Sequence, residues 1–126
     1  MRDFGEAPPP LTLFERLKEG LSRFGTGMFA IWYPQLNRGD ARQLPEKLKK
    51  LADDWLNVAL TVRAPEEDGF GLHGSGIFVI NPPWTLAQTL RDTLPLLRDT
   101  LGMDAGAGYS IETADEHKGK RTRPNL

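Results

Sequence analysis

The sequence predicts an α/β domain, and three observations along its 126 residues support this. Apolar residues recur at helical spacing in three separate stretches. Other short stretches are either apolar throughout or alternate between apolar and polar residues, as strands do. The two kinds of stretch interleave, which is typical of α/β proteins. We therefore predict the order helix, strand, helix, strand, strand, helix, strand.

The first helix is predicted to open at Thr12, with Glu15 three residues later completing a capping box. Apolar residues then follow at helical spacing until Gly25 ends the helix. The next stretch, "MFAIWYP" (28–34), is apolar on both faces. That pattern predicts a buried central strand in a covered parallel sheet.

The middle of the chain predicts a helix followed by two paired strands. The stretch "LNVALTVRA" (56–64) alternates as a half-buried strand does. Residues 65–75 are too few to hide a helix, so they should join 56–64 to strand 76–80 as an antiparallel pair. The helix before this pair is predicted from one apolar stripe: Leu44, Leu48, Leu51 and Trp55.

A third helix is predicted to open at Thr85 with Gln88, and "AGYSIE" (107–112) could form a last short strand. The helix has a long apolar stripe, which consists of Leu86, Leu90, Leu94, Leu97 and Leu101.

The predicted sheet looks incomplete. Strand 28–34 alone is predicted to be a central strand. A central strand needs a neighbouring strand on both sides, and the chain supplies few.

Three parts are expected: an N-terminal loop (1–11), the folded domain (12–115) and a basic, disordered tail (116–126). The tail's cations allow two interpretations, contact with RNA phosphates or simple solubilisation. These cations are Lys118, Lys120, Arg121 and Arg123.

Composition excludes several functions. The net charge of −1 gives no global basic field, and the absence of cysteine excludes disulfides and thiolate chemistry. His73 has no second histidine at ligand spacing, so we expect no metal. The start of the chain does not resemble a signal peptide and no apolar run would span a membrane, so a cytoplasmic protein is expected.

One segment suggests chemistry. In "GIFVINPPWTL" (76–86) a strand runs into Asn81, Pro82, Pro83 and Trp84. Asn/Asp-Pro-Pro-aromatic is the pattern with which amino-methyltransferases hold an exocyclic amine: the side-chain oxygen accepts from the amine and the ring stacks on a flipped base. Two prolines are also an ordinary way to end a strand. The segment alone leaves both interpretations open.

An S-adenosylmethionine site usually needs a glycine-rich turn that leads from a strand into a helix. The glycines in 23–29 and 71–76 precede predicted strands, and those in 102–110 follow a helix. A complete cofactor sheet also needs on the order of 200 residues. We therefore expect no cofactor-binding residues in this chain.

The segments "RFGTGMFAIWYPQL" (23–36) and "GLHGSGIFVINPPWTLAQTLRDTLPLLRDTLG" (71–102) closely resemble the ribosomal RNA large-subunit methyltransferase J family. The resemblance covers about residues 12–115. It implies the C-terminal half of a Rossmann-like, S-adenosylmethionine-dependent 23S rRNA adenine-N6 methyltransferase: one parallel strand, a closing antiparallel pair and flanking helices. It also implies that the cofactor site and the catalytic Asp-Pro-Pro-aromatic motif lie upstream, so that this chain alone is inactive.

By its family position, "NPPW" (81–84) should be a strand end and helix cap, with Trp84 packed, and no catalytic residue is expected here. Trp32 and Tyr33, at the end of strand 28–34, could line the adenine pocket, although packing is favoured. Two rival functions remain: a minimal methyltransferase using Asn81–Trp84, and a non-catalytic RNA-binding or interaction module. The unpaired strand 28–34 predicts self-association or complementation by an N-terminal half.

Overall fold

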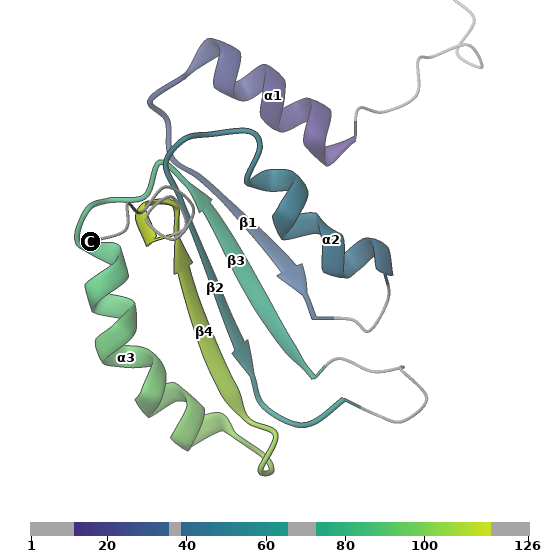
Figure 1. Cartoon of the computed structure of the whole chain (residues 1–126), viewed down its shortest axis with the longest axis vertical. Coiled ribbons are helices and arrows are strands. Elements are labelled where there is room, and N and C mark those ends of the chain that lie inside the picture. The colour runs from purple at the N-terminus through teal and green to yellow at the C-terminus, as the bar shows by residue number, and fades with distance from the viewer. Residues whose placement is uncertain (1–11, 36–38, 66–72, 117–126) are drawn as a thin grey trace, which may run out of the picture.

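The computed structural model describes residues 12–35, 39–65 and 73–116, which form a four-stranded sheet with helices on both faces (Figure 1). The α/β class and the predicted order of elements are confirmed. In chain order the elements are α1 (Leu13–Arg23), β1 (Phe29–Pro34), α2 (Gly39–Leu48), β2 (Trp55–Thr61), β3 (Gly74–Ile80), α3 (Leu86–Leu101) and β4 (Gly108–Thr113). The predicted loop 1–11 and most of the predicted tail lie outside the described residues.

The strands lie in the order β1-β3-β2-β4, and each neighbouring pair is antiparallel. The predicted pairing of the strands on either side of 65–75 is confirmed, with Trp55 opposite Ile80 and Thr61 opposite Gly74. The last short strand is also confirmed, and it pairs with β2.

The prediction for strand 28–34 is wrong in two respects. β1 pairs antiparallel with β3, which is its one partner among the described residues, so it is an edge strand and has no parallel neighbour there. Its burial also alternates: Ile31 and Tyr33 are buried, whereas Ala30 and Trp32 are exposed. A strand with apolar residues on both faces can be buried on both, but only an element that covers each face makes it so. Here one face of β1 is covered.

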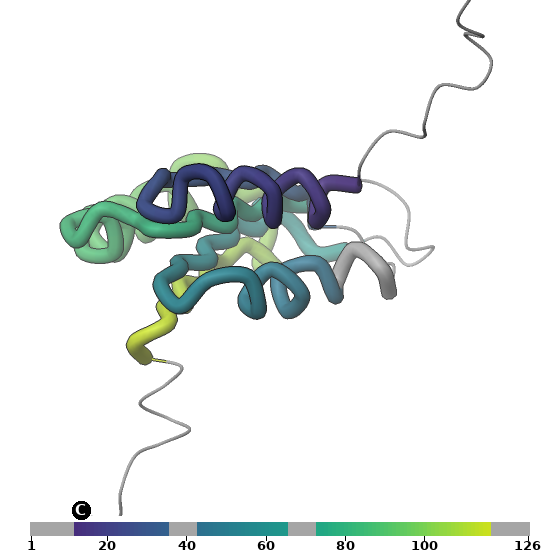
Figure 2. The backbone as a smooth tube through the Cα atoms, turned by 90° about the horizontal axis from the view of Figure 1, so that it is seen from above, coloured from purple at the N-terminus to yellow at the C-terminus, as the bar shows by residue number. Residues whose placement is uncertain are grey.

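The covered face of β1 belongs to the larger core, which α1 and α2 build on one side of the sheet (Figure 1). Trp55 and Phe78 stack at its centre with their ring centroids 5.6 Å apart. On the opposite side α3 packs its leucine stripe over β2 and β4. Figure 2 shows that α1 and α2 run in nearly the same direction.

The predicted starts of the first and third helices are right in position, but only the first has the predicted side-chain capping bond. The Thr12 hydroxyl accepts the backbone N–H of Glu15 at 3.1 Å, as a capping box requires. Thr85 precedes α3 but makes no side-chain capping bond, and Gln88 donates to Asp92 instead. Leu51 and Trp55, both predicted on the second helix, lie beyond its end at Leu48. Trp55 opens β2, and both side chains still pack in the core that α2 covers.

Within the described ranges no helix is long and apolar enough to cross a lipid bilayer.

Candidate functional site

Asn81 ties three loops together at the end of β3. Its side-chain amide donates to the carbonyl oxygens of Gly25 at 3.0 Å and Gly27 at 2.9 Å. Its backbone N–H donates to the carbonyl oxygen of Asp54 at 3.0 Å. Asn81 also has a φ of 56°, in the left-handed region, which asparagine tolerates better than most residues. The residue therefore fixes the turn that follows β3 and the segment that leads into β1.

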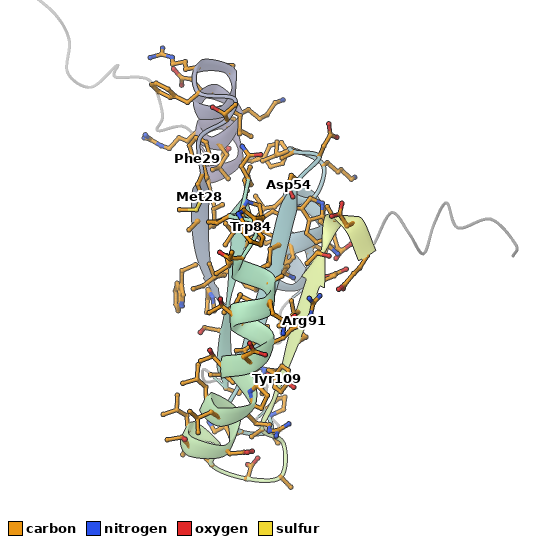
Figure 3. All side chains as sticks on the ribbon, turned by 90° about the vertical axis from the view of Figure 1, so that its left-hand side faces the viewer. Met28, Phe29, Asp54, Trp84, Arg91 and Tyr109 are labelled. Carbon is orange, nitrogen blue, oxygen red and sulfur yellow. The ribbon has the colours of Figure 1, made fainter. Side chains whose placement is uncertain are left out.

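The predicted strand end is thus confirmed, and two finer expectations about "NPPW" (81–84) are wrong. Asn81 does not cap α3, because its amide is directed at the loop before β1. The Trp84 ring does not pack, since its residue is 92 % exposed (Figure 3). The two prolines hold the chain outward after the turn, which leaves the ring beyond the reach of either core. A catalytic role for Asn81, Pro82, Pro83 and Trp84 is not tested by this geometry and stays a prediction.

"NPPW" (81–84) and the C-terminal end of β1 lie at opposite ends of the paired strands β1 and β3. Ile80, which precedes Asn81, stands opposite Phe29, the first residue of β1, and Pro34, the last residue of β1, stands opposite Ser75. Five residue steps at about 3.3 Å along β1 separate the two ends by about 17 Å. A single base cannot touch groups at both, because a purine ring is much shorter than this separation.

Trp32 and Tyr33 point to opposite faces of β1. Tyr33 is 7 % exposed, and its hydroxyl donates to the Asn57 side-chain oxygen at 2.6 Å. Burial raises the pKa of the Tyr33 phenol, although the hydrogen bond to Asn57 opposes this. Trp32 is 58 % exposed. Since the two rings lie on opposite faces, they do not form one pocket, and contact of either ring with a substrate stays a prediction.

Two residues that support Tyr33 were missed by sequence reasoning. Gly76 stands directly opposite Tyr33 on β3, and a Cβ atom on Gly76 would lie 2.2 Å from the Tyr33 ring. Asn57 lies on β2, 24 residues from Tyr33 in sequence. The alternation of residues 56–64 places Asn57 on the face away from Leu56, but no local sequence pattern predicts its hydrogen bond with Tyr33.

A hollow of about 370 Å³ opens beside Trp84, between the start of β2, the start of α3 and the end of β4. Three carboxylates border it: Asp54, Asp115 and Glu116. Arg91 also lines it and forms an ion pair with Glu116. The three carboxylates outnumber the one arginine, and their net negative charge repels phosphate, so this hollow does not suit an RNA backbone.

The described turn from β3 into α3 does not resemble the glycine-rich turn that usually binds S-adenosylmethionine. The connection from β3 to α3 is Asn81-Pro82-Pro83-Trp84-Thr85, which contains no glycine to let a backbone approach a cofactor. Gly25 and Gly27 follow a helix and lead into β1, and Gly102 and Gly106 join α3 to β4. The predicted absence of cofactor residues is not tested by this and stays a prediction. Within the described ranges no group of three His, Cys, Asp or Glu side chains could hold a metal ion together with His73.

Comparison with known proteins places this fold. The family model described as "Ribosomal RNA large subunit methyltransferase D, RlmJ" matches residues 12–113. The chain belongs to this family. The resemblance seen in the sequence is therefore confirmed, and with it the assignment to a family of methyltransferases that modify ribosomal RNA.

Two curated relatives are each named "Ribosomal RNA large subunit methyltransferase J". The Haemophilus influenzae protein is 37 % identical over 97 residues, which are 76 % of this chain and 34 % of the relative. The Escherichia coli protein is 37 % identical over 95 residues, which are 75 % of this chain and 33 % of the relative. The chain thus spans about a third of the length of these RlmJ relatives.

A solved structure has a similar fold. The crystal structure of protein LPL1258 from Legionella pneumophila superposes with a TM-score of 0.70 at 26 % identity. The match covers 80 % of this chain and 37 % of LPL1258.

Proposed function

We propose that this chain forms the C-terminal portion of an S-adenosylmethionine-dependent 23S rRNA adenine-N6 methyltransferase and is inactive without the remainder. The observation that carries the proposal is an edge of β1 with which no other described strand pairs, in a chain that matches about a third of its RlmJ relatives. In the cell we place it in the cytoplasm, where the complete enzyme would meet its RNA.

The connections of the described elements support a neighbour for β1. β1 and β2 run in the same direction, since both are antiparallel to β3, and α2 connects them across one face of the sheet. Such crossovers are almost always right-handed. α1 leads into β1 across the same face and in nearly the same direction as α2 (Figures 1 and 2). A right-handed crossover into β1 through α1 must come from a parallel strand at the free edge of β1.

That position suits the strand that bears the catalytic Asp-Pro-Pro-aromatic motif in the complete enzyme. Being parallel to β1, this strand would end beside Pro34, and ligands of open parallel sheets bind at the carboxyl ends of the strands. "NPPW" (81–84) lies about 17 Å away, at the opposite end of β1. This distance, and the bonding of the Asn81 amide to the Gly25 and Gly27 carbonyls, favour the fragment over a minimal methyltransferase that uses Asn81–Trp84.

Complementation tests the proposal. The chain is purified alone and also together with the two thirds of the Haemophilus influenzae relative that lie outside the match. We expect no saturable binding of S-adenosylmethionine by the chain alone in calorimetry. The mixture should transfer labelled methyl groups to protein-free 23S rRNA.

The complementing polypeptide by itself serves as the control, because it holds the cofactor site but lacks the strands that close the sheet. Micromolar cofactor binding by the isolated chain would contradict the fragment interpretation and favour the minimal enzyme. Salt-sensitive RNA binding by a chain that never restores activity would favour an RNA-binding module instead.

The free edge of β1 also predicts association of the isolated chain. An edge of six residues that pairs with no other described strand offers N–H and C=O groups to a strand of a second chain. Dimers or larger species are therefore expected in analytical ultracentrifugation, and the complementing polypeptide should dissolve them. A chain that stays monomeric over a wide range of concentration would contradict this prediction.

A further inference from the structure

The two faces of the sheet are covered unequally. Neighbouring strands lie about 4.8 Å apart and packed helices about 8–10 Å apart, so one helix covers about two strands. The face that holds the larger core has two helices, α1 and α2, for its four strands. Within the described ranges the opposite face has one, α3, which packs over β2 and β4 and reaches Val79 of β3.

The uncovered part of this face is apolar. Residues of β1 alternate, and Phe29, Ile31 and Tyr33 point into the larger core. The residues between them therefore face the α3 side, where Ala30 stands opposite Val79 and Trp32 opposite Ile77. We call this surface the β1 stripe. Its members are Met28, Ala30, Trp32 and Ile77.

The β1 stripe is exposed despite its composition. Met28 is 59 % exposed, Trp32 58 % and Ile77 39 %. Single exposed apolar residues are ordinary on a protein surface, but adjacent ones mark contact sites. Figure 3, seen from the α3 side, shows β1 along one margin of the sheet with Met28 at its start, beside the strands that α3 covers.

We propose that one amphipathic helix from the remaining two thirds of the methyltransferase packs on the β1 stripe. This helix would lie beside α3, and Trp32 would be the main side chain that it buries. The inference rests on the proposed function, and it adds a second contact to the strand expected at the edge of β1. The relatives carry about twice as much further chain as the matched part, which is ample for such a helix. Sheets built from successive crossovers carry helices on both faces.

The dimensions fit a single helix. From Met28 to Trp32 the strand rises by about 13 Å, which about nine helical residues span at 1.5 Å each. The helix would present apolar residues at positions i, i+4 and i+7, and no member of the β1 stripe carries a charge that would remain unpaired beneath it. The stripe also borders the free edge of β1, so one partner can cover both.

The test uses the full chain and the complementing two thirds of the Haemophilus influenzae relative. Trp32→Glu places a charge in the centre of the stripe and should weaken the complex by about 30-fold or more, as loss of a buried tryptophan anchor does. Trp32→Phe should keep most of the affinity. The control is Met103→Glu, which adds the same charge at a residue 72 % exposed on the loop between α3 and β4; its affinity should stay within about twofold.

A second measurement reports the contact directly. The Trp32 indole N–H resonance, assigned through Trp32→Phe, should become protected from solvent exchange when the complex forms. The melting temperature of the isolated Trp32→Glu chain should match that of the wild type, because its ring is exposed there.

The outcomes separate the two proposals. If the Trp32→Glu chain binds the complementing polypeptide with wild-type affinity and the complex methylates RNA, the proposed helix contact is wrong and the proposed function stands. The same holds if Trp32→Glu raises only the Michaelis constant for RNA, which would indicate a base contact, or disrupts only a dimer of this chain. Failure of any complex to form would overturn both.

Discussion

Replacing Gly76 with alanine should destabilise the fold by about 1–3 kcal/mol, as overpacking of a filled core does. The added Cβ would lie 2.2 Å from Cζ and 2.4 Å from Oη of Tyr33, its direct partner across the strands. The ring would have to move, and that movement would also strain the 2.6 Å hydrogen bond from Tyr33 to Asn57. Chemical denaturation measures the change in the free energy of unfolding.

Gly108→Ala is the matched control. Gly108 is also a strand glycine, but nothing lies within 4 Å of where its Cβ would be, so the same substitution should be nearly neutral. A double-mutant cycle isolates the cause: in a Tyr33→Val chain, Gly76→Ala should cost much less. Equal losses at Gly76 and Gly108 would show that backbone flexibility, and not the tyrosine ring, sets the cost.

The contact between Tyr33 and Gly76 illustrates which parts of the fold can be predicted from sequence. Alternation in 56–64, the leucine stripe of α3 and the cap at Thr12 are local patterns, and each is confirmed in position. Register is not local. That Gly76 stands opposite Tyr33 depends on the pairing of two residues 43 positions apart in the sequence, and no local pattern at either position specifies it.

The prediction that β1 is a central strand was wrong for a related reason. Met28, Ala30 and Trp32 are apolar, and in a complete sheet such residues would be buried, so the pattern predicts a central strand. The sequence reports what a strand is suited to contact, not whether the contact is present in the same chain. The exposed Trp84 is a similar case, because the rigid Pro82-Pro83 pair, and not the affinity of the ring for a core, decides where it lies.

The two roles considered for Asn81 predict opposite results for Asn81→Ala. If the role of Asn81 is structural, the substitution removes its two hydrogen bonds to Gly25 and Gly27, and each contributes about 0.5–1.5 kcal/mol to stability. Alanine must also adopt a φ of 56°, at about 1–2 kcal/mol. A loss of about 2–5 kcal/mol in the free energy of unfolding is expected from these terms together. As the acceptor for a target amine, Asn81 would instead contribute about 10²–10⁴ in rate.

Asn81→Gly separates the structural contributions, because glycine tolerates the left-handed backbone and loses only the hydrogen bonds. It should therefore be more stable than Asn81→Ala by about 1–2 kcal/mol. Turnover is measured with this chain joined to the part of the Escherichia coli relative that lies outside the match, per folded molecule, and should barely change in either variant. A hundredfold fall in turnover with unchanged unfolding would assign Asn81 to catalysis. We expect the reverse, since two hydrogen bonds from the Asn81 Nδ2 hold this side chain against the loop that leads into β1.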